Sequence, residues 1–301
     1  MMFRGQEIKM DHFEPCIHRG SKRKIKCCGQ WICRLHNTDC RLRRYEDAPN
    51  VLACNEWDDK EVDYYAIYRT TQPIAKLPGA LTAITSLNPT PHRLDRQLKC
   101  LQSWVTAGLS IVVVNTQSEL NAMPWSGELA ATVASCRTAE RYDRQVQLVK
   151  SLIDVGITTG GQFMLINSDI EIAGDVSALS LAISLRDRLT ICVRHNYDTG
   201  KETAARREPA GLDAFIMTPA MAETVVDIGL GIGKPGWDYW LPIHFRQQGI
   251  KFNWIQRPLF FHESHPIGWS DADWMRGHDE IKKHYGISIS ESGFRKGLPA
   301  W

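Results

Sequence analysis

The sequence predicts an α/β domain with a mixed, mainly parallel sheet flanked by helices, preceded by a small metal-stapled module. Two observations carry this prediction. From Leu81 onward, short strands rich in β-branched residues alternate with amphipathic helices, which is typical of a parallel sheet covered by helices. Before that point, five of the nine cysteines fall between residues 16 and 40, in a segment too short to build its own core.

Length and composition set the domain organisation. The chain has 301 residues, of which 43% are hydrophobic, so it can bury a sizeable core. We divide it into a cysteine-rich module (1–50), a connector (51–77) with one expected strand at 64–69, and the α/β domain (78–301). No apolar run approaches the roughly 18 residues of a membrane span, and the N-terminus lacks the apolar core of a secretion signal. We therefore expect no membrane insertion and an intracellular location.

The α/β domain begins with a strand, a helix and a second strand. Residues 81–87 form the first expected strand, which ends at the breaker sequence Asn-Pro-Thr-Pro (88–91). Apolar residues at helical spacing predict a helix over 94–105, closed by Gly108, and a β-branched run predicts a strand over 109–116. Such a unit implies adjacent parallel strands joined by a right-handed crossover.

The rest of the domain continues the alternation. A helix is expected over 143–155, ended by Gly156, and is followed by a buried strand over 162–166. Four further elements are expected: a strand at 190–193, a helix near 219–228, a strand near 252–255 and a terminal helix at 271–285.

Polar side chains follow three of the expected strands. In open α/β sheets, ligands bind beyond the carboxyl ends of the strands, so these residues are candidates for ligand binding. The candidates are Thr85 and Asn88 after the first strand, Asn115 after the second, and Asn167, Ser168 and Asp169 after the third. A carboxylate at such a position can hold Mg²⁺ or Mn²⁺, which also grips a diphosphate. The alternative is an ordinary turn, since Asn, Ser and Asp favour turns.

The segment from Leu81 to about Ser270 resembles a glycosyltransferase of the GT-A fold, over roughly two-thirds of the chain. The opening AITSLNPTPHRLDRQLKCLQSWVTAGLSIVVVN is similar to the first strand, helix and second strand of that family. The sequence FMLINSDIEI resembles the family's Asp-x-Asp strand, with Asn167 in place of the first Asp and Asp169 aligned with the last. The resemblance implies that Asp169 is a metal ligand and that the polar strand ends contact a nucleotide.

Two later segments also match the family. GWDYWLP (236–242) resembles its acidic turn and helix, which makes Asp238 the candidate general base of an inverting reaction. The alternative role for Asp238 is a helix cap after Gly236. PLFFHESHP (258–266) resembles the segment whose histidine completes the metal site, and we prefer His262 to His265 because it directly follows the apolar run. Arg93, on the first helix, is a candidate for binding the diphosphate.

The resemblance implies a metal-dependent glycosyltransferase that uses Mn²⁺ or Mg²⁺. Its donor would be a nucleotide sugar, with a UDP-sugar favoured, and its acceptor a hydroxyl of a carbohydrate, a protein or modified DNA. One alternative is a nucleic-acid-binding protein with a degenerate transferase fold, which Asn167 supports. A second is a nucleotidyltransferase, but residues 88–91 do not resemble the Gly-rich, basic loop that such enzymes carry after the first strand.

The cysteine-rich module is interpreted as a zinc site. In an intracellular protein, clustered cysteines indicate metal ligands rather than disulfides. The simplest tetrahedral set is Cys16, Cys28, Cys33 and Cys40, with Cys27, His18 or His36 as substitutes. The segment loosely resembles zinc-ribbon-like pieces at the front of some phage and bacterial glycosyltransferase-like proteins. That resemblance implies a structural Zn²⁺ and the cytoplasm of a bacterial cell or phage-infected host. Free buried cysteines are the alternative.

The same module is strongly basic. Residues 16–44 contain nine Arg or Lys and one acid, Asp39, which gives 9 − 1 = +8, whereas the whole chain carries +2. A basic patch of this kind favours a polyanionic partner, so a nucleic acid acceptor is one candidate. The alternatives are a solvated surface and a module that only braces the catalytic domain.

Overall fold

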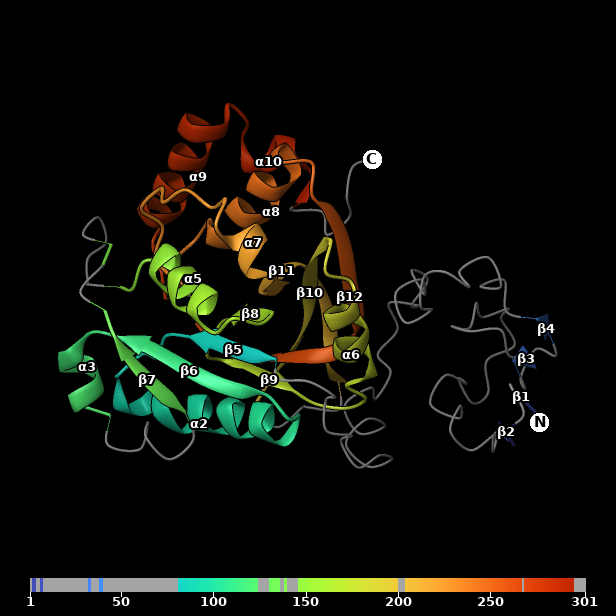
Figure 1. Cartoon of the computed structure of the whole chain (residues 1–301). Helices are drawn as coiled ribbons and strands as arrows, with labels where there is room; N and C mark the ends of the chain where they lie inside the picture. Colours follow the sequence, from blue (N-terminus) through green and yellow to red (C-terminus); the bar gives the residue numbers. More distant parts are fainter. Residues whose placement is uncertain are drawn as a thin grey trace.

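The computed structural model (Figure 1) describes residues 81–123, 130–135, 138–139, 146–199, 204–266 and 268–294, together with four two-residue strands nearer the N-terminus. These are β1 (Met2–Phe3), β2 (Gln6–Glu7), β3 (Ile32–Cys33) and β4 (Thr38–Asp39), which pair antiparallel as β1 with β2 and β3 with β4. The predicted zinc ligands Cys16, Cys28 and Cys40, their three substitutes and the expected strand at 64–69 lie outside the described residues. For Cys33 only the backbone pairing is described.

An eight-stranded sheet forms the centre of the described α/β region (Figure 1). Its strand order is β7-β6-β5-β8-β11-β10-β12-β9. Four of its seven pairings are parallel, and the three antiparallel ones involve β11 and β9. The strands are β5 (Thr82–Thr85), β6 (Ser110–Asn115), β7 (Ala131–Ala134), β8 (Phe163–Ile166), β9 (Ile170–Ile172), β10 (Arg188–Tyr197), β11 (Arg206–Met217) and β12 (Lys251–Glu263). The predicted α/β class with a mixed sheet is confirmed.

Helices cover both faces of this curled sheet (Figure 1). The described helices are α2 (Pro91–Thr106), α3 (Gln117–Asn121), α5 (Val149–Thr158), α6 (Ser177–Ser184), α7 (Pro219–Ala222), α8 (Trp237–Gln247), α9 (Asp271–Tyr285) and α10 (Ile289–Ser292). None of the helices in the part of the chain described by the structure is both long and apolar enough to cross a membrane.

Strand β8 shows how the two faces are built. Its side chains alternate between two hydrophobic clusters because successive residues of a strand point to opposite faces. Phe163 and Leu165 pack in the cluster that contains residues of α5 and α8, and Met164 and Ile166 pack in the cluster that contains residues of α2. All four are buried, which explains why the strand reads as a continuous apolar run.

The first predicted unit is confirmed. Strands β5 and β6 are adjacent and parallel, with Thr82 opposite Ser110, and α2 connects them. Strand β5 also pairs in parallel with β8 on its other side. The chain therefore proceeds from β5 outward through β6 to β7, then returns to β8 across β5. The carboxyl ends of β5 and β8 flank this reversal, which is where open α/β sheets bind ligands.

Several predicted boundaries were wrong. Gly156 does not end a helix: it lies inside α5, where the absence of a side chain leaves room for the ring of Phe163. The expected helix at 219–228 is the single turn of α7, whereas the strands expected at 190–193 and 252–255 extend into the longer β10 and β12. Pairing with neighbouring strands extends β10 and β12, and this tertiary contribution has no local pattern.

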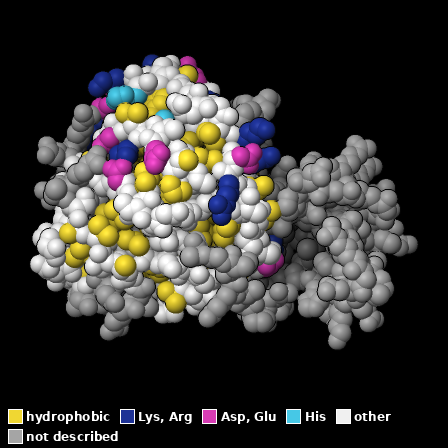
Figure 2. Space-filling view, viewed as in Figure 1, with side chains coloured by type: hydrophobic (Ala, Val, Ile, Leu, Met, Phe, Trp, Pro, Cys, Tyr) yellow, Lys and Arg dark blue, Asp and Glu magenta, His cyan; other side chains and the backbone are white. Residues whose placement is uncertain are grey.

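The terminal helix was predicted at its observed bounds. Ser270 and Asp273 form a capping box at the start of α9, and Gly286 ends it in the left-handed conformation, so both signals are local. Figure 2 shows Lys, Arg and His side chains gathered over this helix, whose last turn carries Lys282, Lys283 and His284. Positive charge at this end stabilises the helix by complementing its dipole.

Helix α9 packs closely on the loop that precedes α8. Gly277 of α9 faces the backbone of Pro235, and a Cβ added at Gly277 would collide with the carbonyl oxygen of Pro235. One turn earlier, Asp273 forms a buried ion pair with Lys234 at 2.8 Å. The loop and the start of α8 are therefore held against α9 by close contact and by charge.

We expect Gly277→Ala to destabilise the protein by about 1–3 kcal/mol, because the new methyl group must displace backbone. In an unobstructed helix the same change would stabilise it by up to about 1 kcal/mol. Denaturant unfolding measures the difference, with Asp279→Ala, at an exposed position of the same helix, as the control. A Gly277→Ala protein as stable as the wild type would contradict this packing.

Candidate active site

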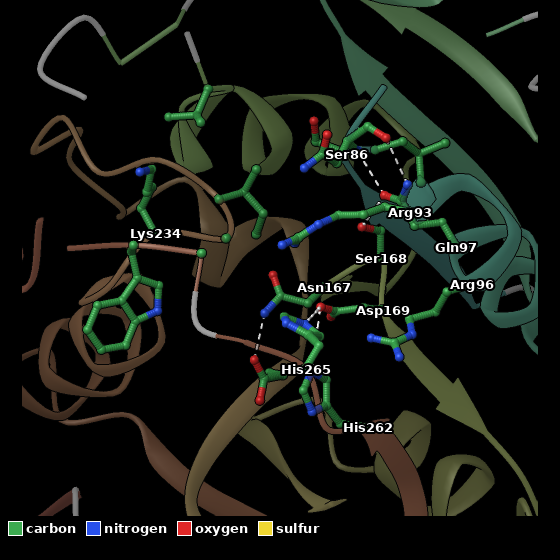
Figure 3. A pocket seen from close by; sticks show the side chains of 18 of the residues that line it. Ser86, Arg93, Arg96, Gln97, Asn167, Ser168, Asp169, Lys234, His262 and His265 are labelled. Carbon is green, nitrogen blue, oxygen red and sulfur yellow. Dashed lines mark hydrogen bonds and ion pairs between the residues drawn. The ribbon is translucent and has the colours of Figure 1, made fainter. Parts of the chain in front are cut away.

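A cavity of about 1140 Å³ opens at the carboxyl ends of β5 and β8 (Figure 3). Residues 86–89, which follow β5, and residues 167–169, which follow β8, both line it. The cavity thus lies at the reversal of strand order described above. Its volume slightly exceeds the range of about 300–1,000 Å³ that is typical of small-molecule sites.

Asp169, His262 and His265 converge on this cavity (Figure 3). The Oδ2 atom of Asp169 lies 3.2 Å from Nε2 of His265 and 3.5 Å from Nε2 of His262. The candidate ligand atoms of the three residues all lie within 4.8 Å of one another. One carboxylate and two imidazoles at this spacing form a donor set for a divalent metal ion.

Backbone pairing brings the three residues together. Asp169 lies in the turn between β8 and β9, and β9 pairs antiparallel with β12 so that Ile170 lies opposite His262. His265 follows the end of β12 by two residues. The predicted partners Asp169 and His262 are therefore neighbours, and His265, which we ranked below His262, lies slightly closer to the carboxylate.

The two histidines determine the charge of Asp169. Burial by itself would raise the pKa of this carboxyl group, but hydrogen bonds from His262 and His265 outweigh it and hold the pKa well below its usual value. In return, the hydrogen bond to Asp169 raises the pKa of His265, although partial burial and the positive charge of Arg93 oppose that shift. Asp169 is thus a carboxylate at all physiological pH values.

Asn167 is not isolated from negative charge. Its Nδ2 donates a hydrogen bond of 2.6 Å to Oδ1 of Asp213 in β11, whose other oxygen accepts from Arg194 at 2.7 Å. Asp213 is buried, and all three residues line the cavity. The Asp213 carboxylate therefore lies next to the Asn167 amide, and Arg194 balances the charge of Asp213.

Asp238 lies in the first turn of α8 and also lines the cavity. Gly236, in the left-handed conformation, is the N-cap residue, and its N–H donates to Oδ1 of Asp238 at 3.2 Å. Burial raises the pKa of Asp238 to about 7, the negative charge of Asp213 adds to the shift, and the charge of Arg194 opposes it. The carboxyl group thus bonds to the helix start and also has the pKa expected of a general base near neutral pH.

Among the predicted nucleotide-binding residues, Asn88 and Ser168 line the cavity and share one partner. Oε1 of the buried Gln97 accepts from the N–H of Asn88 at 2.7 Å and from the hydroxyl of Ser168 at 2.8 Å. Gln97 returns a bond to the carbonyl oxygen of Asn88 at 2.8 Å. Gln97 of α2 therefore ties together the two strand ends that form the base of the cavity.

Thr85 and Asn115 do not line the cavity. Thr85 is fully buried at the end of β5, and the next residue, Ser86, which follows the strand, reaches the cavity instead. Asn115 bonds the backbone of Leu87 through both ends of its amide, at 2.9 Å each. Asn115 therefore fixes the position of the loop after β5 and does not face the cavity.

The two arginines of α2 differ. Arg93 lines the cavity, with its guanidinium group against Gly268. Arg96 also lines it but forms an ion pair with Glu263 at 2.8 Å. Arg93 is therefore the better placed of the two to meet an anionic ligand.

Sequence reasoning missed several residues of this site. Asp213 and Arg194 come from strands with no polar motif, and Gln97 reads as a surface position of a helix. An acid inside the apolar run of β11 was the one signal that pointed to Asp213. Trp269 and Trp274, whose rings stack at a centroid distance of 6.0 Å, add an aromatic wall that no motif predicted.

The sequence matches no protein-family model, and no curated protein is significantly similar to it. The function is therefore argued from the geometry of the site.

The hydrogen bond between Asp169 and His265 predicts a histidine that titrates above its usual pKa of about 6.5. Asp169→Asn removes the negative charge, so the pKa of His265 should fall in that variant. NMR titration of the metal-free protein measures this, with His278, which lies outside the cavity lining, as an internal control. Equal His265 values in the two proteins would contradict the contact.

Proposed function

We propose that the protein is a metal-dependent glycosyltransferase that moves a sugar from a nucleotide sugar to an acceptor hydroxyl. One observation carries the proposal: a three-residue metal-binding set and a carboxyl group with a pKa of about 7 face the same large cavity at the carboxyl ends of β5 and β8. Metal-assisted transfer from a diphosphate uses a site for the ion, and an inverting transfer also uses a base for the acceptor.

The two distances to Asp169 are compatible with one bound transition-metal ion. Ligand bonds of about 2.1 Å place two ligands of one ion at most about 4.2 Å apart, and the distances of 3.2 and 3.5 Å satisfy this limit. Mg²⁺ prefers oxygen ligands, whereas two imidazoles favour a softer ion. Of the two ions predicted, Mn²⁺ is therefore the better supported.

Such an ion, bound by Asp169, His262 and His265, would supply positive charge next to the leaving diphosphate. Arg93 adds a second positive charge to the same wall of the cavity. In an inverting reaction Asp238 accepts the proton of the acceptor hydroxyl. The new bond forms between the acceptor oxygen and the anomeric carbon, and the bond from that carbon to the phosphate oxygen breaks, releasing the nucleoside diphosphate.

The alternatives have less support. A degenerate transferase fold was suggested by Asn167, but Asp213 places a carboxylate beside that amide and the metal-binding set has three members. The nucleotidyltransferase alternative still lacks a Gly-rich, basic loop after the first strand of the domain. The donor class favoured by the resemblance is a UDP-sugar. A nucleic acid acceptor is supported by the +8 charge of residues 16–44, and a structural Zn²⁺ by the cysteines there.

A panel of nucleotide sugars tests the proposal. With Mn²⁺ present, we expect one donor to be hydrolysed slowly or to raise the melting temperature, and EDTA to abolish the effect. Asp169→Ala should lower transfer at least about 100-fold without unfolding the protein, because it removes the central metal ligand. Asp187→Ala, at an exposed acid outside the cavity lining, is the control.

Transfer at the normal rate in Asp169→Ala would exclude this metal site. Absence of hydrolysis and of thermal stabilisation with every nucleotide sugar would exclude the function itself.

The raised pKa of Asp238 predicts a pH dependence. A base must be deprotonated, so kcat/KM should fall about tenfold per pH unit below pH 7 and level off above it. Asp238→Asn should reduce kcat about 10²- to 10⁴-fold and flatten the profile. Enzyme kinetics between pH 5 and 9 provide the measurement, and a profile in Asp238→Asn with the wild-type midpoint would assign the titration to another group.

Stability supplies an independent readout of the same group. A folded-state pKa above the unfolded value of about 3.9 stabilises the protein fully below pH 4, and this contribution is lost as the pH rises through 7. Asp238→Asn should therefore melt at a higher temperature than the wild type above pH 7 and show a weaker dependence on pH between 4 and 8.

A further inference from the structure

Gln147 differs from the other side-chain amides that line the cavity. It is 2% exposed, and among the residues that the structure describes neither its Nε2 nor its Oε1 has a hydrogen-bond partner. By contrast, Gln97 bonds through both ends of its amide and Asn167 bonds to Asp213. Leaving a buried amide unpaired costs free energy. A ligand group that both accepts and donates a hydrogen bond would satisfy both polar atoms of Gln147.

The backbone holds Gln147 in place. Its carbonyl oxygen accepts from the N–H of Ile232 at 3.0 Å, and the bridge between Leu148 and Gly231 continues this antiparallel contact. The next residue, Val149, begins α5 and donates to the carbonyl oxygen of Leu230 at 2.9 Å. A side chain on such a fixed segment can select a ligand by geometry.

Apolar residues flank Gln147 along the backbone. Val146 precedes it in the chain, Ile232 is hydrogen-bonded to its backbone, and both are buried and line the cavity. Leu87 and Pro89, from the loop after β5, line the same cavity. A cavity lined by a buried amide and by aliphatic side chains suits a flat ring with polar atoms on its edge, because such pockets bind a ligand mainly by apolar contact and orient it with a few polar groups.

We propose that the amide of Gln147 recognises the hydrogen-bonding edge of the donor's nucleobase. The inference rests on the proposed function, since it requires a nucleotide donor. A diphosphate would use only the donor half of an amide and is better matched by Arg93 and the metal-binding set. A nucleobase edge offers an adjacent donor and acceptor, with which Gln and Asn form paired hydrogen bonds.

Calorimetry with UDP, CDP, GDP, ADP and inorganic pyrophosphate, all with Mn²⁺, tests the assignment. Gln147→Met keeps the unbranched shape and removes both polar atoms. It should bind the preferred nucleoside diphosphate at least tenfold more weakly than the wild type, while pyrophosphate affinity stays within twofold. Its melting temperature without ligand should not fall, because an unpaired amide has been removed.

Gln162→Met is the matched control. Gln162 is also buried and its Oε1 lacks a partner among the described residues, but it does not line the cavity, so nucleotide affinity should be unchanged.

The outcomes separate the two proposals. If the wild type binds none of the four nucleotides, the proposed function and this assignment both fail. If the wild type binds a nucleotide but Gln147→Met binds it equally well, or weakens pyrophosphate to the same extent, only the role of Gln147 is overturned.

Discussion

The antiparallel pairing of β9 with β12 is the contact on which the rest of the site depends. Ile170 lies opposite His262, and this register joins segments that are about ninety residues apart in the chain. Without it, Asp169 would end a turn with no histidine near it. Backbone hydrogen bonds between strands are rigid and directional, so the three candidate metal ligands are positioned by main-chain geometry rather than by flexible side chains.

Charges around the cavity are arranged mostly in compensated pairs. Arg194 faces Asp213, Arg96 faces Glu263 and Lys234 faces Asp273, each at 2.7 or 2.8 Å. Buried charges are costly unless they are paired, so these contacts make a polar cavity compatible with a stable fold. Arg194 pairs with Asp213, so its positive charge only partly stabilises the ionised form of Asp238. This helps to explain why the pKa of Asp238 is about 7.

The fold was predictable from the sequence wherever the determining signals were local. The apolar run of β8 and the caps of α9 act within a few residues, and each element of the strand-helix-strand unit at the start of the domain has its own local pattern. The site was predictable only in part. Asp169 stands at a strand end and His262 follows an apolar run, whereas Asp213 and Gln97 depend on which strands and helices become neighbours.

Two predicted ligand-binding residues, Thr85 and Asn115, proved wrong because of the direction of their side chains. Thr85 is the last residue of β5 and is buried, whereas Ser86, the first residue after the strand, reaches the cavity. Asn115 has the right chemistry to bind a ligand, but its amide is taken up by the backbone of Leu87. A single sequence does not say which partner a polar group will find, because that depends on long-range packing.

Asp273 connects Lys234, in the wall of the cavity, to the first turn of α9. The same oxygen accepts from the ammonium group of Lys234, which lines the cavity, and from the N–H of Ser270, which starts α9. Displacing the wall at Lys234 would therefore also break the first turn of α9 and uncover a charge. This side of the cavity is consequently expected to resist movement, because moving it would cost both of these contacts.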